Sequence, residues 1–364
     1  MSNTIDTKNW WELPLECKPN FEMAMKRIYA WYESEVIDRA PIIFLGNGGF
    51  SGGEQQKKSW ATMKDGWFDV EHQVENFIRT IEGGKFLAET FPVYWPNLGP
   101  NVFSAFYGSE LEFMPTTSWA IPFIHEWEDI HKLCLDWNNQ YLKKIEELTK
   151  YALERCEGKF MVGYTDLHPG MDCVAAWRDS QELCYDLYEN PDEVKLAINK
   201  ALDDFQTVYN HFDAMLKAKN QLSATWLGVP SFGKMHIPSN DFSAMISENH
   251  FIDFCLPGIQ KEVEQMTHNI WHLDGKDCAR HIDILLTVSQ IQGFQWVQGD
   301  GAKPIMQWVP LIKKIQAAGK SVLVYLDKPE IEDFLGAVEP KGIMLCVEGN
   351  GDEDQIIKRV EKWV

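Results

Sequence analysis

The sequence lacks long apolar runs and clustered basic residues, and each absence excludes a class of function. No apolar stretch reaches the roughly 20 residues that a helix needs to cross a bilayer. The chain has 34 Lys and Arg against 54 Asp and Glu, a formal charge of −20, and only seven of its residues are arginine. Because nucleic-acid surfaces need clustered Lys and Arg, we expect a protein that binds neither nucleic acid nor membrane.

Cysteine pairs at metal or redox spacing are also missing. The eight cysteines are scattered along the chain without a CxxC pair, which is typical of reduced thiols rather than of a disulfide framework. The first 25 residues carry acidic side chains and no continuous apolar segment, so they do not resemble a signal peptide. We therefore expect a cytoplasmic protein.

What the chain does contain is a regular alternation of apolar segments and amphipathic stretches. Hydrophobic residues make up 45% of it, including 15 Trp and 20 Phe, which is enough for a sizeable core. Segments 137–155, 190–217, 251–267 and 310–318 have apolar residues at helical spacing. Between them lie short apolar segments that predict buried parallel strands. These are 41–48, 159–166, 223–230, 269–275, 293–299, 321–327 and 342–349, with an eighth candidate at 241–247.

This alternation predicts an α/β fold, a (β/α)8 TIM barrel with an N-terminal elaboration. Several candidate strands end in Gly, Asp, His or Asn, as expected where strand ends meet an active site. Residues 60–135 interrupt the alternation with a loop-rich aromatic stretch. We interpret them as an insertion after the first strand that forms a lid, a pocket wall or a dimer surface. The whole chain, 1–364, is then one domain.

Acid–base residues cluster after two of the candidate strands. In YTDLHPGMD (164–172), Asp166 lies near His168, and a carboxylate beside a histidine shifts the pKa of both groups. A capping role at the start of the next helix is the alternative for Asp172. In QWVQGDG (295–301), Asp300 follows another strand. We take Asp166, His168 and Asp300 as candidate catalytic residues.

Aromatic and amide side chains near strand ends are candidate substrate contacts. Aromatic walls suit a sugar, an aromatic ring or a methylated ammonium, although core packing is the commoner fate of tryptophan. GNGGF (46–50) lacks the GxGxxG spacing and a Walker lysine, so its glycines favour close approach to a ligand over nucleotide binding. The candidates are Asn47, Tyr94, Trp95, Tyr164, Trp226, Gln295 and Trp296.

Several segments resemble the uroporphyrinogen decarboxylase superfamily, which includes the corrinoid and methylcobalamin:coenzyme M methyltransferases. They are AWYESEVIDRAPIIF (30–44), DLYENPDEV (186–194), DFSAMISENHFIDFCLPGIQKEVEQM (241–266) and IWHLDG (270–275). The resemblance spans most of the chain at low density and implies a TIM barrel and a homodimer. True decarboxylases have an arginine-bearing Met-Arg-Gln-Ala-Gly segment after Arg-x-Pro. Here Arg39-Ala40-Pro41 precedes IIFLGNGGF, and this missing arginine argues against decarboxylation of a porphyrinogen.

The resemblance also implies a zinc site. The methyltransferase branch binds zinc through a His-x-Cys on one strand and a Cys on the last strand. The corresponding residues here are His272, Asp274 and Cys346, all of types that bind zinc, and residues i and i+2 of a strand share a face. Carboxylate in place of thiolate favours an oxygen acceptor over the thiol of coenzyme M. The alternatives are hydrogen bonding at a strand end for His272 and Asp274, and simple burial for Cys346.

We therefore expect a zinc-dependent methyltransferase or demethylase that acts on a small molecule. The corrinoid would arrive on a partner protein, because the chain has no Asp-x-His-x-x-Gly motif. Two alternatives stay open. One is a metal-free lyase or hydrolase that acts on a carbohydrate-like ligand through Asp166 and Asp300. The other is a non-catalytic binding subunit.

Overall fold

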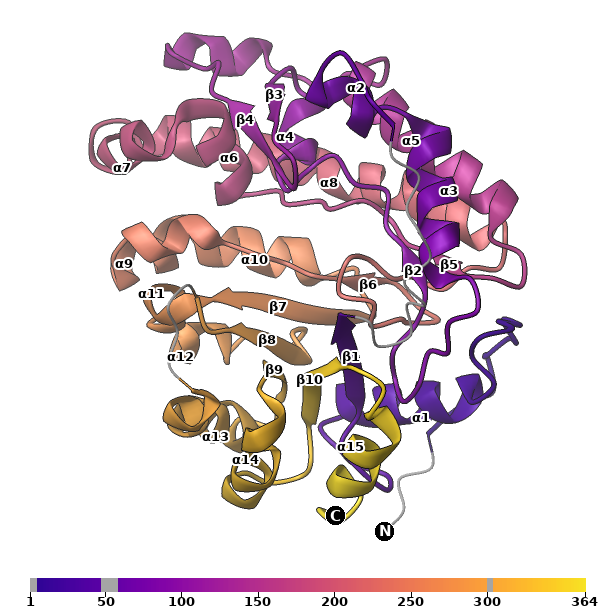
Figure 1. The fold of residues 1–364 in the computed structure, drawn as a ribbon. Helices are drawn as coiled ribbons and strands as arrows, with labels where there is room; N and C mark the ends of the chain where they lie inside the picture. The colour runs from indigo at the N-terminus through magenta and orange to yellow at the C-terminus, as the bar shows by residue number, and fades with distance from the viewer. Residues whose placement is uncertain (1–4, 47–57, 300–303) are drawn as a thin grey trace.

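The main sheet of the protein is parallel and has six strands in the order β1-β10-β9-β8-β7-β6 (Figure 1). The computed structural model describes residues 5–46, 58–299 and 304–364. Strands β1, β9 and β10 are largely apolar because both faces of the sheet are covered, and β10 buries every side chain except that of Glu348. Strand β7 differs, since four of its seven residues are polar or charged. The strands are β1 (Ile42–Gly46), β6 (Met235–His236), β7 (His268–Asp274), β8 (Gly293–Val297), β9 (Ser321–Tyr325) and β10 (Ile343–Gly349).

The prediction of a closed eight-stranded barrel is wrong. Within the described residues the sheet is curled but open, with β1 at one edge and β6 at the other. Strands β2 (Val93–Tyr94) and β5 (Met161–Val162) form a separate two-stranded parallel sheet. At the free edge of β1, the side chains of Glu89 and Thr90 accept hydrogen bonds from the backbone N–H groups of Ile42 and Phe44. Side chains thus occupy positions that a neighbouring strand would take in a closed barrel.

Two segments predicted as strands fold differently. Segment 223–230 contributes one isolated bridge, between Ser223 and Ser231. Segment 241–247 begins with a 3₁₀ helix, η2 (Asp241–Met245), because the Asn240 side chain accepts a hydrogen bond from the Ser243 N–H and caps it. Apolar content does not distinguish a short strand from a helical turn.

The helices next to the sheet follow the predicted periodicity. The longest helix of the protein, α8 (Pro191–Lys217), belongs to the layer that faces the sheet, and it begins with a proline and two acidic residues, which are favoured at helix N-termini. It packs against α10, which follows a π-helical turn. The helical elements next to the sheet are α1 (Phe21–Tyr32), α9 (Glu248–His250), η3 (Phe251–Cys255), α10 (Leu256–Val263), α11 (Gly275–Ala279), α12 (Ile282–Leu285), η4 (Ile305–Trp308), α13 (Val309–Ala317), η5 (Lys328–Glu330), α14 (Ile331–Ala337) and α15 (Glu353–Val360).

A second layer faces the sheet and contains the segment interpreted as an insertion (Figure 1). It includes an antiparallel hairpin of β3 (Glu110–Phe113) and β4 (Ser118–Ile121). No helix in the described parts of the chain has the length and apolarity to span a membrane. The helices of this layer, besides α8, are α2 (Met63–Trp67), α3 (Val70–Ile81), α4 (Val102–Ala105), η1 (Trp127–Lys132), α5 (Gln140–Arg155), α6 (Met171–Arg178) and α7 (Ser180–Glu189).

Candidate active site

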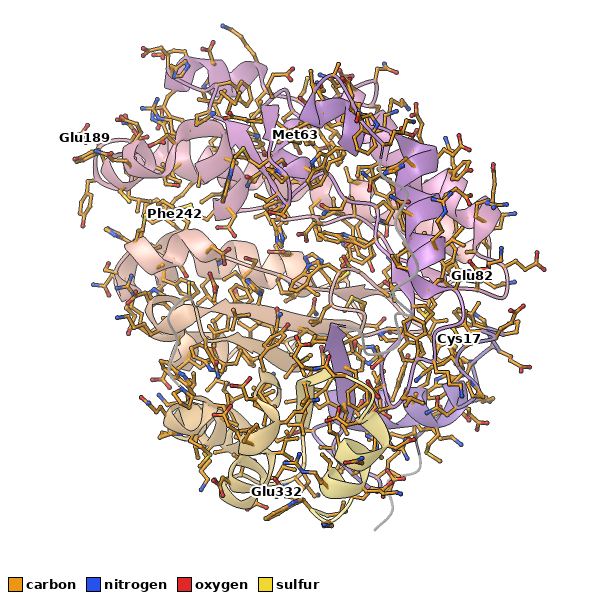
Figure 2. All side chains as sticks on the ribbon, viewed as in Figure 1. Cys17, Met63, Glu82, Glu189, Phe242 and Glu332 are labelled. Atoms are coloured by element: carbon orange, nitrogen blue, oxygen red, sulfur yellow. The ribbon has the colours of Figure 1, made fainter. Side chains whose placement is uncertain are left out.

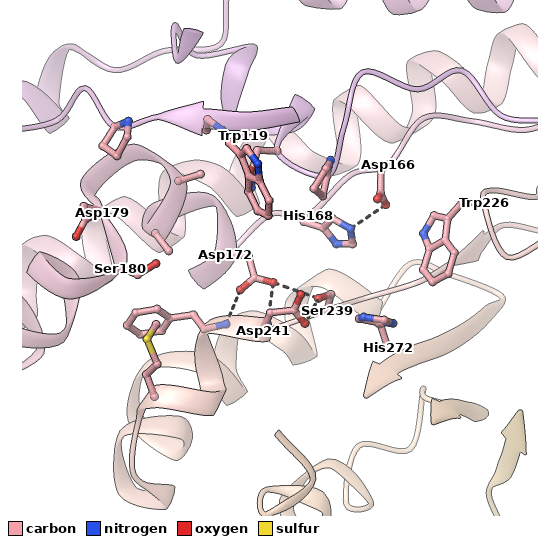
Figure 3. A pocket seen from close by; sticks show the side chains of 18 residues that line it. Trp119, Asp166, His168, Asp172, Asp179, Ser180, Trp226, Ser239, Asp241 and His272 are labelled. Atoms are coloured by element: carbon pink, nitrogen blue, oxygen red, sulfur yellow. Dashed lines mark hydrogen bonds and ion pairs between the residues drawn. The ribbon is translucent and has the colours of Figure 1, made fainter. Parts of the chain in front are cut away.

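A pocket of about 660 Å³ lies between the two layers, a volume typical of small-molecule sites. Its upper wall includes Trp119 of β4 and Asp172 of α6, and its lower wall includes Asp241 of η2 and His272 of β7 (Figure 3). Phe242, another lining residue, lies between the upper layer and the helices above the sheet (Figure 2). The hairpin of the predicted insertion therefore contributes to the pocket wall.

Three side chains of metal-ligating type converge at this pocket. One ligand atom each of Asp241, His272 and Asp274 lies within 4.8 Å of the others. His272 and Asp274 point to the same face of β7, as their spacing predicted, and Asp241 approaches from η2. One imidazole and two carboxylates form a competent zinc donor set, and three protein ligands leave a coordination position for a substrate.

His272 is held in an orientation that suits a ligand. Its Nδ1 lies 2.7 Å from Oε1 of Gln295, whose Nε2 donates to the hydroxyl of Tyr325 at 2.6 Å. Because Oε1 only accepts, Nδ1 carries the proton and the neutral ring keeps its lone pair on Nε2. The ring of Trp226 packs edge-on against His272 with centroids 5.6 Å apart. Gln295 therefore supports the candidate metal ligand, and its predicted contact with a substrate stays a prediction.

Asp172 fixes the segment that carries Asp241. Its carboxylate accepts hydrogen bonds from the backbone N–H groups of Asp241 and Phe242, both at 3.0 Å, and from the Ser239 hydroxyl at 3.1 Å (Figure 3). Loss of water around the Asp241 carboxylate and the negative charge of Asp172 raise the pKa of Asp241 to about 6, although the residue still reaches solvent. A bound cation would relieve this repulsion, so the donor set fits a divalent metal.

Asp166 and His168 form an ion pair on another wall of the pocket, with Oδ1 and Nε2 2.8 Å apart. Burial by itself would lower the pKa of His168, but the charge of Asp166 and its hydrogen bond outweigh burial and raise that pKa to about 9. His168 is thus protonated at neutral pH and is equipped to act as an acid. The sequence favoured this pairing, and the catalytic role of both residues stays a prediction.

Cys346, the third predicted zinc ligand, lies apart from this group. Strands β10 and β7 are separated in the sheet by β9 and β8, so three strand spacings, roughly 14 Å, lie between Cys346 and His272. The thiol is buried, and burial raises its pKa. A carboxylate from η2 takes the place that the sequence assigned to this cysteine.

The residues predicted to contact the substrate lie in several different parts of the structure. Trp226 lines the pocket beside His272. Tyr94 and Trp95 instead line a second pocket of about 300 Å³. Trp296 lies on the opposite face of β8 from Gln295, fully buried against another tryptophan. Asn47 and Asp300 lie outside the described residues.

Tyr164 is wholly buried and belongs to a polar cluster in the core. Its hydroxyl lies 3.2 Å from Nδ1 of His236, and Nε2 of His236 lies 2.8 Å from Oε1 of Glu262. Burial raises the pKa of Glu262 and lowers that of His236, so both groups are favoured in their uncharged forms. Tyr164 therefore supports the core instead of contacting a substrate.

Sequence reasoning missed Asp241 and Trp119 as pocket residues. Asp241 follows Asn240, and an Asn-Asp pair is more typical of a helix start than of a strand. That signal identifies a turn, but it does not place the turn beside β7. No family model and no curated protein matches the sequence.

Proposed function

We propose that this chain is a metal-dependent enzyme that acts on a small molecule bound in the pocket described above. One observation carries the proposal: ligand atoms of Asp241, His272 and Asp274 lie within 4.8 Å of one another at the edge of a pocket of about 660 Å³. One imidazole and two carboxylates are ligands that zinc accepts. Because no sulfur takes part, these ligands are harder Lewis bases than thiolates.

Each polar residue then has a defined task. A divalent ion at this site would polarise a substrate oxygen or nitrogen as a Lewis acid. His168 holds a proton, and its Nδ1 is buried without a hydrogen-bond partner among the described residues, so this N–H is the one that would turn to a bound substrate. Asp166 stabilises the imidazolium through Nε2. Gln295 orients the ring of His272 through Nδ1 and leaves Nε2 as the nitrogen that would bind a metal.

The reaction that we propose is a methyl transfer or demethylation in which a corrinoid protein is the partner. Its support is the resemblance to the corrinoid methyltransferases described above, together with a donor set suited to an oxygen or nitrogen heteroatom. We further propose a cytoplasmic homodimer. All eight cysteines are free, which is compatible with a reducing compartment.

Elemental mass spectrometry of protein expressed with sufficient zinc tests the metal site. We expect about one zinc per chain, and a loss of at least tenfold in occupancy in Asp241→Asn and Asp274→Asn after dialysis. Cys346→Ser should keep its zinc because the thiol lies apart from the donor set. The matched control is Asp277→Asn, which removes an exposed carboxylate on neighbouring α11.

Two results would contradict the proposal. Unchanged zinc in Asp241→Asn and Asp274→Asn would place the metal elsewhere. Absence of zinc and of other divalent metals from the wild-type protein would favour a metal-free hydrolase or lyase, or a binding subunit.

A further inference from the structure

The charged side chains that line the pocket are almost all acidic. Asp166, Asp172, Asp179 and Asp241 line it, and neither lysine nor arginine does so among the described residues. The protonated ring of His168 is paired with Asp166, so it offsets only that carboxylate. A divalent ion would offset Asp241 and Asp274. The charges of Asp172 and Asp179 would still not be offset. The pocket therefore keeps a net negative charge with or without metal.

Two arginines, Arg178 and Arg280, lie on elements next to the pocket, and both form hydrogen bonds with other groups of the protein. Arg178, at the end of α6, donates to Asp186 at 2.8 Å and to the backbone carbonyl of Ile124 at 3.2 Å. Arg280, just after α11, donates to the carbonyls of Ser243 and Ala244 at 3.1 and 2.6 Å. An anionic substrate would thus enter the pocket without a free guanidinium to bind it.

Aromatic rings border the same space. Trp119 projects from β4 with 57% of its surface exposed, and Trp226 packs against His272 (Figure 3). A half-exposed tryptophan at the mouth of a negative pocket presents a π face to whatever enters. Such faces attract ammonium groups, and methylated ones most readily give up water to bind there.

From these observations we propose that the pocket selects an organic cation, a methylated ammonium compound, as its substrate. The ammonium group would lie between Trp119 and the carboxylates of Asp172 and Asp179. This inference rests on the proposed function for the reaction, in which one methyl group would pass from the ammonium nitrogen to the Co(I) of the partner's corrinoid, and the amine would leave with the bonding electron pair. Binding of the cation does not depend on the metal.

Isothermal titration calorimetry of the full chain, freed of metal with EDTA, tests the inference. The probes are choline and 3,3-dimethyl-1-butanol, which have the same shape but differ in charge. We expect choline to bind at least tenfold more tightly. Asp179→Asn should weaken choline binding severalfold and leave the alcohol unaffected, because asparagine keeps the cap that Asp179 gives to α7. Trp119→Ala should weaken choline binding about threefold to fivefold.

The control is Trp137→Ala, which removes another exposed tryptophan, one that does not line the pocket, and should leave both affinities unchanged. Equal affinity for the two probes, tighter binding of the alcohol, or no binding of choline would overturn the inference. Because metal is absent from this experiment, such a failure would not touch the metal site. Loss of the metal site in the zinc measurement would likewise leave cation selection standing.

Discussion

His168 keeps a proton in the folded chain over a pH range in which an unfolded histidine loses it. Its pKa rises from an ordinary 6.5 to about 9 in the folded protein because the charge of Asp166 outweighs burial. A group whose folded pKa is raised stabilises the protein fully below its unfolded pKa and loses that stabilisation as pH rises through the folded pKa. The stabilising effect of the pair is therefore present below pH 6.5 and lost by about pH 9.

We predict that the free energy of unfolding of the metal-free protein falls between these pH values by on the order of 2–3 kcal/mol through this pair. Asp166→Asn should remove most of that dependence, because an amide carries no charge to hold the proton on His168. Urea unfolding of both proteins at pH 6 and pH 9 measures the difference. Identical pH dependence in the two proteins would show that the ion pair does not form.

At the same scale, the sequence predicted part of the candidate metal group. The spacing of His272 and Asp274 placed both side chains on one face of β7, since alternation along a strand is a local property. The position of Asp241 is not local. It depends on Asp172, on α6 of the other layer, which accepts the backbone N–H groups at the start of η2. Contacts between distant segments leave no periodic signal, and the family resemblance points to a cysteine, Cys346, in place of Asp241.

Among the elements, β1 depends on a buried ion pair. Arg39 and Glu89, 2% and 0% exposed, are joined by contacts of 2.7 and 2.9 Å, and Glu89 also accepts the N–H of Ile42. The Arg-x-Pro motif that contributed to the family resemblance thus has a structural task here. Removing one partner of a buried pair leaves the other charge unpaired.

We predict that Glu89→Gln lowers the free energy of unfolding by about 3 kcal/mol. The matched control is Asp283→Asn, which breaks an ion pair with Lys314 whose side chains are 70% and 47% exposed. That change should cost less than about 1 kcal/mol. Chemical denaturation of the two variants gives the comparison, and equal losses would mean that the buried pair does not anchor β1.

The periodicity of the sequence predicted the long strands and helices better than the short ones. Five of the predicted strands, β1, β7, β8, β9 and β10, and all four helical patterns are confirmed. The predicted strand 159–166 is reduced to the two residues of β5, and β2 and β6 also have two residues each, too few for a period-two pattern. Segment 241–247 carries apolar residues but also a capping asparagine before it, and the cap decided its conformation.

On the scale of the whole molecule, side chains from both layers form the candidate site. The sheet supplies His272 and Asp274, the opposite layer supplies Asp166, His168 and Asp172, and the pocket lies between them (Figure 3). Closure of a barrel would require strands at the free edges of β1 and β6, and short-range patterns contain no information about those edges. The alternation of strands and helices therefore predicted the parallel sheet correctly and its closure wrongly.

We propose above that a metal is bound by oxygen and nitrogen ligands of Asp241, His272 and Asp274. X-ray absorption spectroscopy of the zinc-loaded full chain tests it most directly, because Zn–S bonds are near 2.3 Å and Zn–N or Zn–O bonds near 2.0–2.2 Å. We expect a first shell of nitrogen and oxygen alone, with an imidazole signature that is lost in His272→Ala. A sulfur at about 2.3 Å would show that a cysteine binds the metal and would contradict this ligand set.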